Sequence, residues 1–204
     1  MSKALTNPLA GIVAAASKKL PAKTGAVQEH AHRVATGADV VILADTSGSM
    51  FEMAGRRRKI DILSEALTVV RGDLPSATTI AFDSLPKRLA PHEPLPAPDG
   101  GTALHLAIDE AARLRPRKTI VITDGQPDNE RQAISSAGRL TGTIDVIYCG
   151  NDNDTQAIDF LRRLAAAAGG TIIVHDLKRY GEASVKAIAS AAATLALPAP
   201  KHGA

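Results

Sequence analysis

The stretch Val40–Met50, VVILADTSGSM, places an unbroken aliphatic run directly before an aspartate and two serines. Such a run, of strand length and rich in Val, Ile and Leu, is typical of a strand buried on both faces of a parallel sheet. The side chains of Asp45, Ser47 and Ser49 follow it at alternate positions. By residue type they fit a turn or helix cap, a phosphoryl-transfer site or ligands for a hard metal ion.

The composition of the chain favours one aliphatic α/β domain. The 204 residues are 45% hydrophobic but only 2% aromatic, so the core must be built from Val, Ile, Leu and Ala. We expect an N-terminal arm with a short amphipathic helix over residues 1–37, the α/β domain over residues 38–197, and a C-terminal tail over residues 198–204.

From residue 38 onward, segments with strand patterns alternate with segments of helical spacing. We expect an edge strand over residues 85–89, further strands over residues 40–44, 78–82, 119–123, 144–149 and 171–175, and helices over residues 60–71, 102–114, 129–140, 155–168 and 182–197. Crossover helices between buried strands require a mostly parallel sheet. The fold class predicted is therefore α/β, a doubly wound sheet with helices on both faces.

Charge and cysteine content disfavour several classes of protein. The net charge is +3, but the basic clusters at residues 56–59 and 113–118 are short and have almost no aromatic neighbours, so we expect solvated faces and no nucleic-acid partner. No stretch approaches the roughly 20 apolar residues of a membrane span. The single cysteine, Cys149, predicts a buried thiol and a cytoplasmic protein.

The predicted strands deliver oxygen-bearing side chains to one edge of the sheet. Strand 40–44 is followed by Asp45, Ser47 and Ser49, strand 119–123 is followed by Asp124, and Thr102 follows a Gly-Gly pair. In doubly wound sheets, ligands bind outside the carboxyl ends of the strands. Two carboxylates and three hydroxyls suit Mg²⁺, with Mn²⁺ or Ca²⁺ as alternatives, and disfavour Zn²⁺.

These three segments, Asp-Thr-Ser-Gly-Ser, Gly-Gly-Thr and Ile-Thr-Asp-Gly, resemble the metal-ion-dependent adhesion site of von Willebrand factor A (vWA) domains. The resemblance implies a Rossmann-like domain whose mostly parallel sheet has one antiparallel edge strand. It implies that Ser47, Ser49 and Thr102 contact the metal directly, whereas Asp45 and Asp124 act largely through water. A glutamate or aspartate from a protein partner would then complete the coordination.

The function expected from this resemblance is a non-catalytic, metal-dependent protein-interaction module. The resemblance also implies a role as an accessory subunit of a larger assembly, because intracellular bacterial members of the family commonly act in this way, often beside AAA+ ATPases of the MoxR type. Two alternatives stay open. One is a Mg²⁺-dependent phosphatase or phosphotransferase with Asp45 as nucleophile. The other is a scaffold that binds its partner through the N-terminal arm.

Further residues surround the predicted site in the sequence. Asp128 is expected to cap helix 129–140, with support of the metal ligands as the weaker alternative. The candidate partner-binding rim consists of Arg56, Arg57, Arg58, His92 and His105. A positive rim of this kind would steer an acidic partner toward the metal.

Overall fold

A computed structural model describes residues 39–181 and 183–197 of the chain. The predicted arm over residues 1–37 and the tail over residues 198–204 lie outside the described residues, so both stay predictions.

The described residues form a six-stranded sheet in the order β5-β4-β1-β6-β7-β8. Its strands are β1 (Val40–Asp45), β4 (Thr78–Phe82), β5 (Pro86–Arg88), β6 (Lys118–Thr123), β7 (Thr143–Tyr148) and β8 (Ile172–Val174). All neighbouring pairs are parallel except β4 and β5, which are antiparallel. This confirms the predicted mostly parallel sheet with one antiparallel edge strand.

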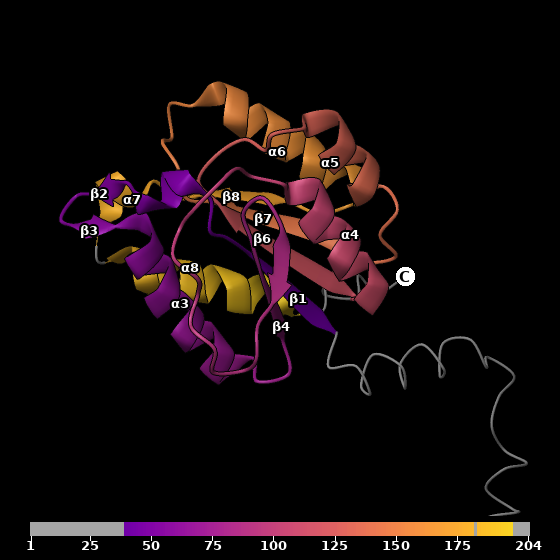
Figure 1. The fold of residues 1–204 in the computed structure, drawn as a ribbon, viewed down its shortest axis with the longest axis horizontal. Helices are drawn as coiled ribbons and strands as arrows, with labels where there is room; N and C mark the ends of the chain where they lie inside the picture. Colours follow the sequence, from indigo (N-terminus) through magenta and orange to yellow (C-terminus); the bar gives the residue numbers. More distant parts are fainter. Residues whose placement is uncertain (1–38, 182, 198–204) are drawn as a thin grey trace, which may run out of the picture. The chain divides into compact units, whose positions relative to one another are not determined.

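Helices cover both faces of this sheet (Figure 1). Helices α4 (Leu104–Leu114), α5 (Glu130–Ala137) and α6 (Thr155–Ala167) pack on one face. Helices α3 (Lys59–Asp73) and α8 (Ala183–Ala196) pack on the other. The doubly wound α/β architecture is therefore as predicted.

The central strand divides its side chains between two cores. Val41 and Leu43 of β1 are buried among the residues of α4, α5 and α6, whereas Ile42 and Ala44 are buried against α3 and α8. Successive side chains of a strand point to opposite faces, so a strand covered on both sides must be apolar at every position. This explains the unbroken aliphatic run of β1.

Three short elements were not predicted. They are the 3-10 helix η1 (Gly48–Phe51), the hairpin of β2 (Met53–Ala54) with β3 (Arg57–Arg58), and α7 (Leu177–Tyr180). Each has only two to four residues, too few to carry a periodic hydrophobic pattern. Cys149 is buried, as predicted. No helix in the described part of the chain is long and apolar enough to cross a membrane.

The connection from α6 to β8 depends on the absence of a side chain at Gly170. A Cβ atom at this position would lie 1.8 Å from the backbone carbonyl oxygen of Ile144, which belongs to β7. We expect Gly170→Ala to lower the free energy of unfolding by about 1–3 kcal/mol, because backbone must shift to admit the methyl group. Chemical denaturation measures this loss.

The matched control is Gly72→Ala, in the last turn of α3, where an added Cβ would meet no atom within 4 Å. Here alanine should leave stability unchanged or raise it by up to about 1 kcal/mol, because alanine favours helix. Equal stability of the two variants would contradict the proposed close contact at Gly170.

Candidate metal centre

The candidate site lies where the winding of the sheet changes direction. The chain leaves β1 for its neighbour β4, and later returns to form β6 on the other side of β1. Crevices at such reversals, outside the carboxyl ends of the strands, are the usual ligand sites of open α/β sheets. Asp45 is the last residue of β1, and Asp124 directly follows β6, so the topology brings the two predicted carboxylates to this crevice.

Asp45 is completely buried and held by hydrogen bonds on both carboxylate oxygens. The backbone N–H of Ser47 donates to Oδ1 at 2.8 Å, and the Thr123 hydroxyl donates to Oδ2. Burial, followed by the nearby charge of Asp124, raises the pKa of Asp45 to about 6 despite these hydrogen bonds. A bound cation would relieve the cost of this buried negative charge.

A chain of hydrogen bonds links the first segment to Asp124. The hydroxyls of Ser47 and Ser49 lie 3.1 Å apart, and the Ser49 hydroxyl donates to Oδ1 of Asp124 at 2.7 Å. Ser47 is buried, whereas Ser49 is exposed. Three of the predicted ligands, of which Ser49 and Asp124 are 75 residues apart along the chain, therefore form one connected set that reaches the protein surface.

The loop that carries Thr102 is fastened to the same region through its backbone. The N–H of Gly48 donates to the Gly100 carbonyl oxygen at 3.2 Å, and Thr102 N–H donates to the Asp128 carboxylate at 2.9 Å. Within the described residues, the Thr102 hydroxyl forms no hydrogen bond. The structure thus brings the Thr102 loop to the site without engaging its side chain.

Asp128 does not cap α5, contrary to our first prediction. The cap of α5 is Asn129, whose side chain accepts a hydrogen bond from the backbone of Gln132. The Asp128 carboxylate instead binds the backbone of Thr102, and a Cβ atom at Gly101 would lie 2.4 Å from it. Asp128 therefore joins the Thr102 loop to the segment after β6, a contact between distant residues that local capping patterns do not indicate.

Lys59 is part of the site, and the prediction of a solvated face over residues 56–59 is wrong for this residue. Its ammonium group lies 2.6 Å from Oδ2 of Asp124 and 2.8 Å from the carboxylate of Glu52. Burial lowers the pKa of Lys59, but the hydrogen bonds to Asp124 and Glu52 outweigh it, so the pKa is raised overall. Lys59 therefore stays charged beside Asp124.

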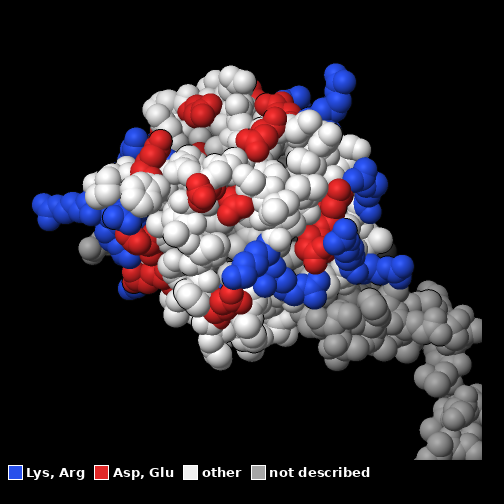
Figure 2. Space-filling view, viewed as in Figure 1, with Lys and Arg blue, Asp and Glu red and all other residues white. Residues whose placement is uncertain are grey.

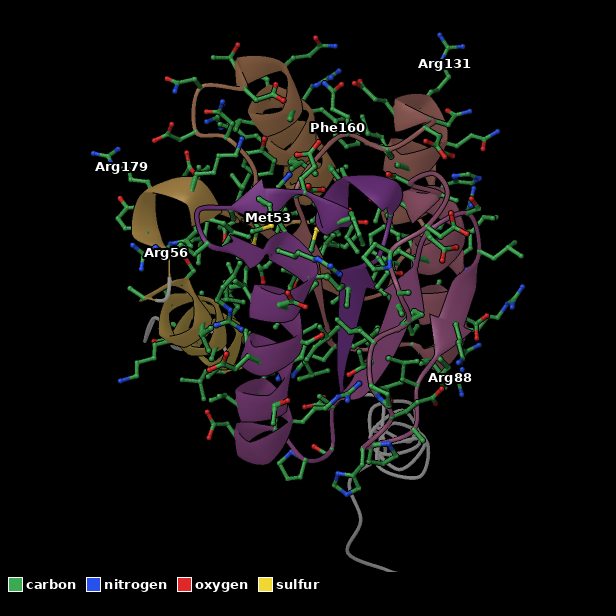
Figure 3. The ribbon with its side chains drawn as sticks, turned by 60° about the vertical axis from the view of Figure 1, so that its left-hand side comes forward. Met53, Arg56, Arg88, Arg131, Phe160 and Arg179 are labelled. Carbon is green, nitrogen blue, oxygen red and sulfur yellow. The ribbon has the colours of Figure 1, made fainter. Side chains whose placement is uncertain are left out.

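The predicted rim residues are spread over several places. Arg57 pairs with Glu65 at 2.8 Å, and the guanidinium group of Arg58 lies 4.3 Å from the centre of the Phe51 ring. Arg56 is exposed and lies on the same side of the molecule as Met53 (Figure 3).

The two predicted rim histidines lie in different parts of the domain. His105 lies in the first turn of α4, three residues after Thr102. His92 lines a cavity of about 550 Å³ together with Arg71, Thr78 and Arg88. Thr78 begins β4, so this cavity lies at the end of the strand opposite to the candidate site. The structure thus does not bring His92 together with the other rim residues.

The donor set fits a hard divalent cation. Every candidate ligand offers oxygen, which hard divalent cations prefer. One of the two carboxylates, Asp124, already pairs with the ammonium group of Lys59. Among the described residues, no group of three or more His, Cys, Asp or Glu side chains could hold a metal. A metal here would therefore depend on the hydroxyls as well as the aspartates. A cavity of about 250 Å³, lined by Ser49, Lys59 and Asp124 among others, opens beside these groups.

Comparisons with known proteins agree with this fold. The family model of the von Willebrand factor type A domain matches residues 92–173, which include Thr102 and Asp124 but not the first segment. No curated protein matches the chain in sequence.

Several solved structures resemble the fold at low sequence identity. An aerotolerance-related membrane protein from Bacteroides fragilis is 17% identical, with a TM-score of 0.56 over 77% of this chain and 99% of that chain. BatB from Bacteroides thetaiotaomicron is 15% identical, with a TM-score of 0.52 over the same shares of the two chains. The pilus adhesin SpaC from Lactobacillus rhamnosus GG is 10% identical, with a TM-score of 0.58 over 76% of this chain and 30% of that chain. The fold is therefore vWA-like.

Proposed function

We propose that this chain is a non-catalytic protein-interaction domain that holds Mg²⁺, or alternatively Mn²⁺ or Ca²⁺, and binds an aspartate or glutamate of a partner protein. Asp45, Ser47, Ser49, Thr102 and Asp124 would hold the metal. The observation that carries the proposal is the connected set of Ser47, Ser49 and Asp124, whose middle member, Ser49, is exposed. Domains of the vWA family are generally interaction modules of this non-catalytic kind.

The metal, when bound, would supply a positive centre that accepts a carboxylate oxygen from the partner. The residues of this chain would position that centre at the surface, with Ser49 exposed and Ser47 and Asp45 buried beneath it. Burial of Asp45 argues against the alternative of a phosphotransferase. The residue is 0% exposed, so a phosphoryl group cannot reach either oxygen in this conformation.

The surface beside the site suits a partner that combines acidic and apolar groups. Two apolar side chains border the site, because Phe51 and Met53 lie within four residues of Ser49 in the sequence. Phe51 is 54% exposed and Met53 is 51% exposed. Exposed arginines, Arg56 and Arg58, accompany them. Apolar side chains bordered by positive charge would bind an acidic residue flanked by apolar neighbours.

The distribution of charge on one face of the molecule does not favour nucleic acid. On the face seen in Figure 2, basic and acidic side chains are interspersed and form no single positive field. The family resemblance suggests a role as an accessory subunit in the cytoplasm, with an AAA+ ATPase of the MoxR type as the candidate partner. The single cysteine, which is buried and free, is consistent with that compartment.

Affinity capture from the native host tests the proposal, with the full chain as bait in buffer containing Mg²⁺ or EDTA. We expect one partner to be retained with Mg²⁺ and lost with EDTA, because the metal forms the bridge between the two proteins. Ser49→Ala should lose most of this binding, since its hydroxyl is the exposed member of the ligand set.

The matched control is Ser190→Ala, an exposed serine on α8. This variant should bind as the wild type does. After the partner has been identified, replacement of its acidic residues by amides locates the carboxylate that binds. Retention of the same partner in EDTA, by the wild type and by Ser49→Ala alike, would overturn the proposal.

A further inference from the structure

Lys59 differs from the three arginines before it because the fold turns its side chain inward. It is the first residue of α3, and its backbone N–H donates to the Glu52 carbonyl oxygen at 3.0 Å. The residue is 7% exposed, and its ammonium group lies between the carboxylates of Glu52 and Asp124. A positive charge of the protein itself is thus built into the candidate metal centre.

Both oxygens of Asp124 are engaged. Ser49 donates to Oδ1 at 2.7 Å, and Lys59 donates to Oδ2 at 2.6 Å. A metal that used this carboxylate, directly or through water, would have to share it with Lys59 or displace the ammonium group. Glu52 offers that group a second partner on the protein surface, where its own side chain is 62% exposed. Lys59 could therefore keep an ion pair after leaving Asp124.

Lys59 changes the net charge that a bound metal would leave at the centre. In the buried part of the centre, ionised Asp45 and Asp124 contribute two negative charges and Lys59 contributes one positive charge. The Glu52 carboxylate also pairs with Lys59, but its side chain is 62% exposed, so water largely screens its charge from the metal position. A divalent cation would therefore change the net charge of these groups from −1 to +1. An incoming carboxylate would bring it to zero. Charges within a few ångströms of one another in a partly buried site interact strongly, so each step should affect the next.

We propose that Lys59 acts as a tethered cation that competes with the divalent metal for Asp124 and so makes tight metal binding depend on the carboxylate of the partner. The inference rests on the proposed function. Without a partner, repulsion between the ammonium group and the metal keeps metal affinity low. With a partner, the added negative charge removes this cost. Coupling of this kind is reciprocal, so metal and carboxylate each strengthen the binding of the other.

Calorimetric titration of the metal-free full chain with Mg²⁺ and with Mn²⁺ tests the inference. We expect Lys59→Met and Lys59→Gln to bind the metal on the order of tenfold more tightly than the wild type, because removal of a nearby like charge favours the cation. The Gln variant can still donate a hydrogen bond to Asp124, which protects the fold if the Met variant does not fold. Lys59→Arg keeps the charge and should retain the weak binding.

Acetate serves as the probe for the carboxylate of the partner. At constant ionic strength, replacing chloride with acetate should tighten Mg²⁺ binding to the wild type more than to Lys59→Gln, because only the wild-type centre has an excess positive charge to neutralise. The control variant is Lys118→Met, which loses a different lysine–aspartate pair, with Asp145. Lys118 begins β6, roughly 17 Å from the candidate site at about 3.3 Å per residue.

The outcomes separate the inference from the proposed function. Equal metal affinity in wild type and in a folded Lys59 variant overturns the role of Lys59 but leaves the metal site in place. An equal gain in Lys118→Met overturns it too, because the effect would then reflect net charge alone. Failure of both wild type and Lys59 variants to bind either metal overturns the inference and the proposed function together.

Discussion

Asp45→Asn is expected to stabilise the metal-free protein at pH 7 and to abolish its Mg²⁺ binding. Asp45 is completely buried, and its pKa is raised from 3.8 to about 6 by burial and by the charge of Asp124. At neutral pH the folded protein therefore carries a costly ionised group. Asparagine removes the charge but can keep both hydrogen bonds, accepting from Ser47 and donating to Thr123. We expect a gain of about 2–3 kcal/mol, as a shift of about two pKa units implies.

The gain from Asp45→Asn should depend on pH in a defined direction. The pKa of Asp45 is higher in the folded than in the unfolded wild type, so folding favours the protonated form. The stability that this protonated form gives the wild type is fully present below about pH 4 and is lost as the pH rises through about 6. The two proteins should therefore be similar in stability near pH 4 and diverge up to pH 7. Urea denaturation in EDTA at several pH values measures the difference.

A variant less stable than the wild type at pH 7 in EDTA would contradict this account of Asp45. Calorimetric titration of the same protein with Mg²⁺ measures the second effect. The two results together would mean that the chain retains a destabilising residue at this position because metal binding needs it.

The main architecture could be predicted because its signal is local. The aliphatic residues of β1 predict a strand buried on both faces, and the helical spacing of Ile60, Leu63 and Val70 predicts α3. The observed β1 begins at the predicted residue and ends one residue later, and α3 begins one residue earlier and ends two residues later than predicted. Rules of winding then place Asp45 and Asp124 at one crevice without knowledge of any contact.

The contacts that fix the site could be predicted only in part. Lys59 looks like a member of a charged run, yet it lies four residues before Leu63 and seven before Ala66, on the buried face of α3. That spacing is a local signal that could have indicated its burial. Its partner Asp124 is 65 residues away, and so depends on tertiary structure. The link between Asp128 and Thr102 is likewise long-range.

Asp124→Ala is expected to act in the opposite direction from Asp45→Asn, although both remove a carboxylate from the same centre. In the folded protein, Asp124 is the acceptor for the Lys59 ammonium group and for the Ser49 hydroxyl. Removal of one partner of a buried ion pair leaves the other charge without compensation, which costs about 3–5 kcal/mol in comparable cases. Lys59 can still pair with the exposed carboxylate of Glu52. We therefore expect the free energy of unfolding to fall by about 3 kcal/mol, near the lower end of this range. Urea denaturation in EDTA measures it.

The double variant Lys59→Met/Asp124→Ala separates the ion pair from the packing of either side chain. If the cost of Asp124→Ala comes from an uncompensated ammonium group, removing that group should restore stability, and the cycle of single and double variants should give a coupling of about 2 kcal/mol. Additive effects would mean that Lys59 and Asp124 contribute independently. If this coupling is found and Asp45→Asn is more stable than the wild type, the two aspartates have opposite roles. Asp124 is already neutralised by a charge of the protein, whereas Asp45 is the carboxylate that needs the metal.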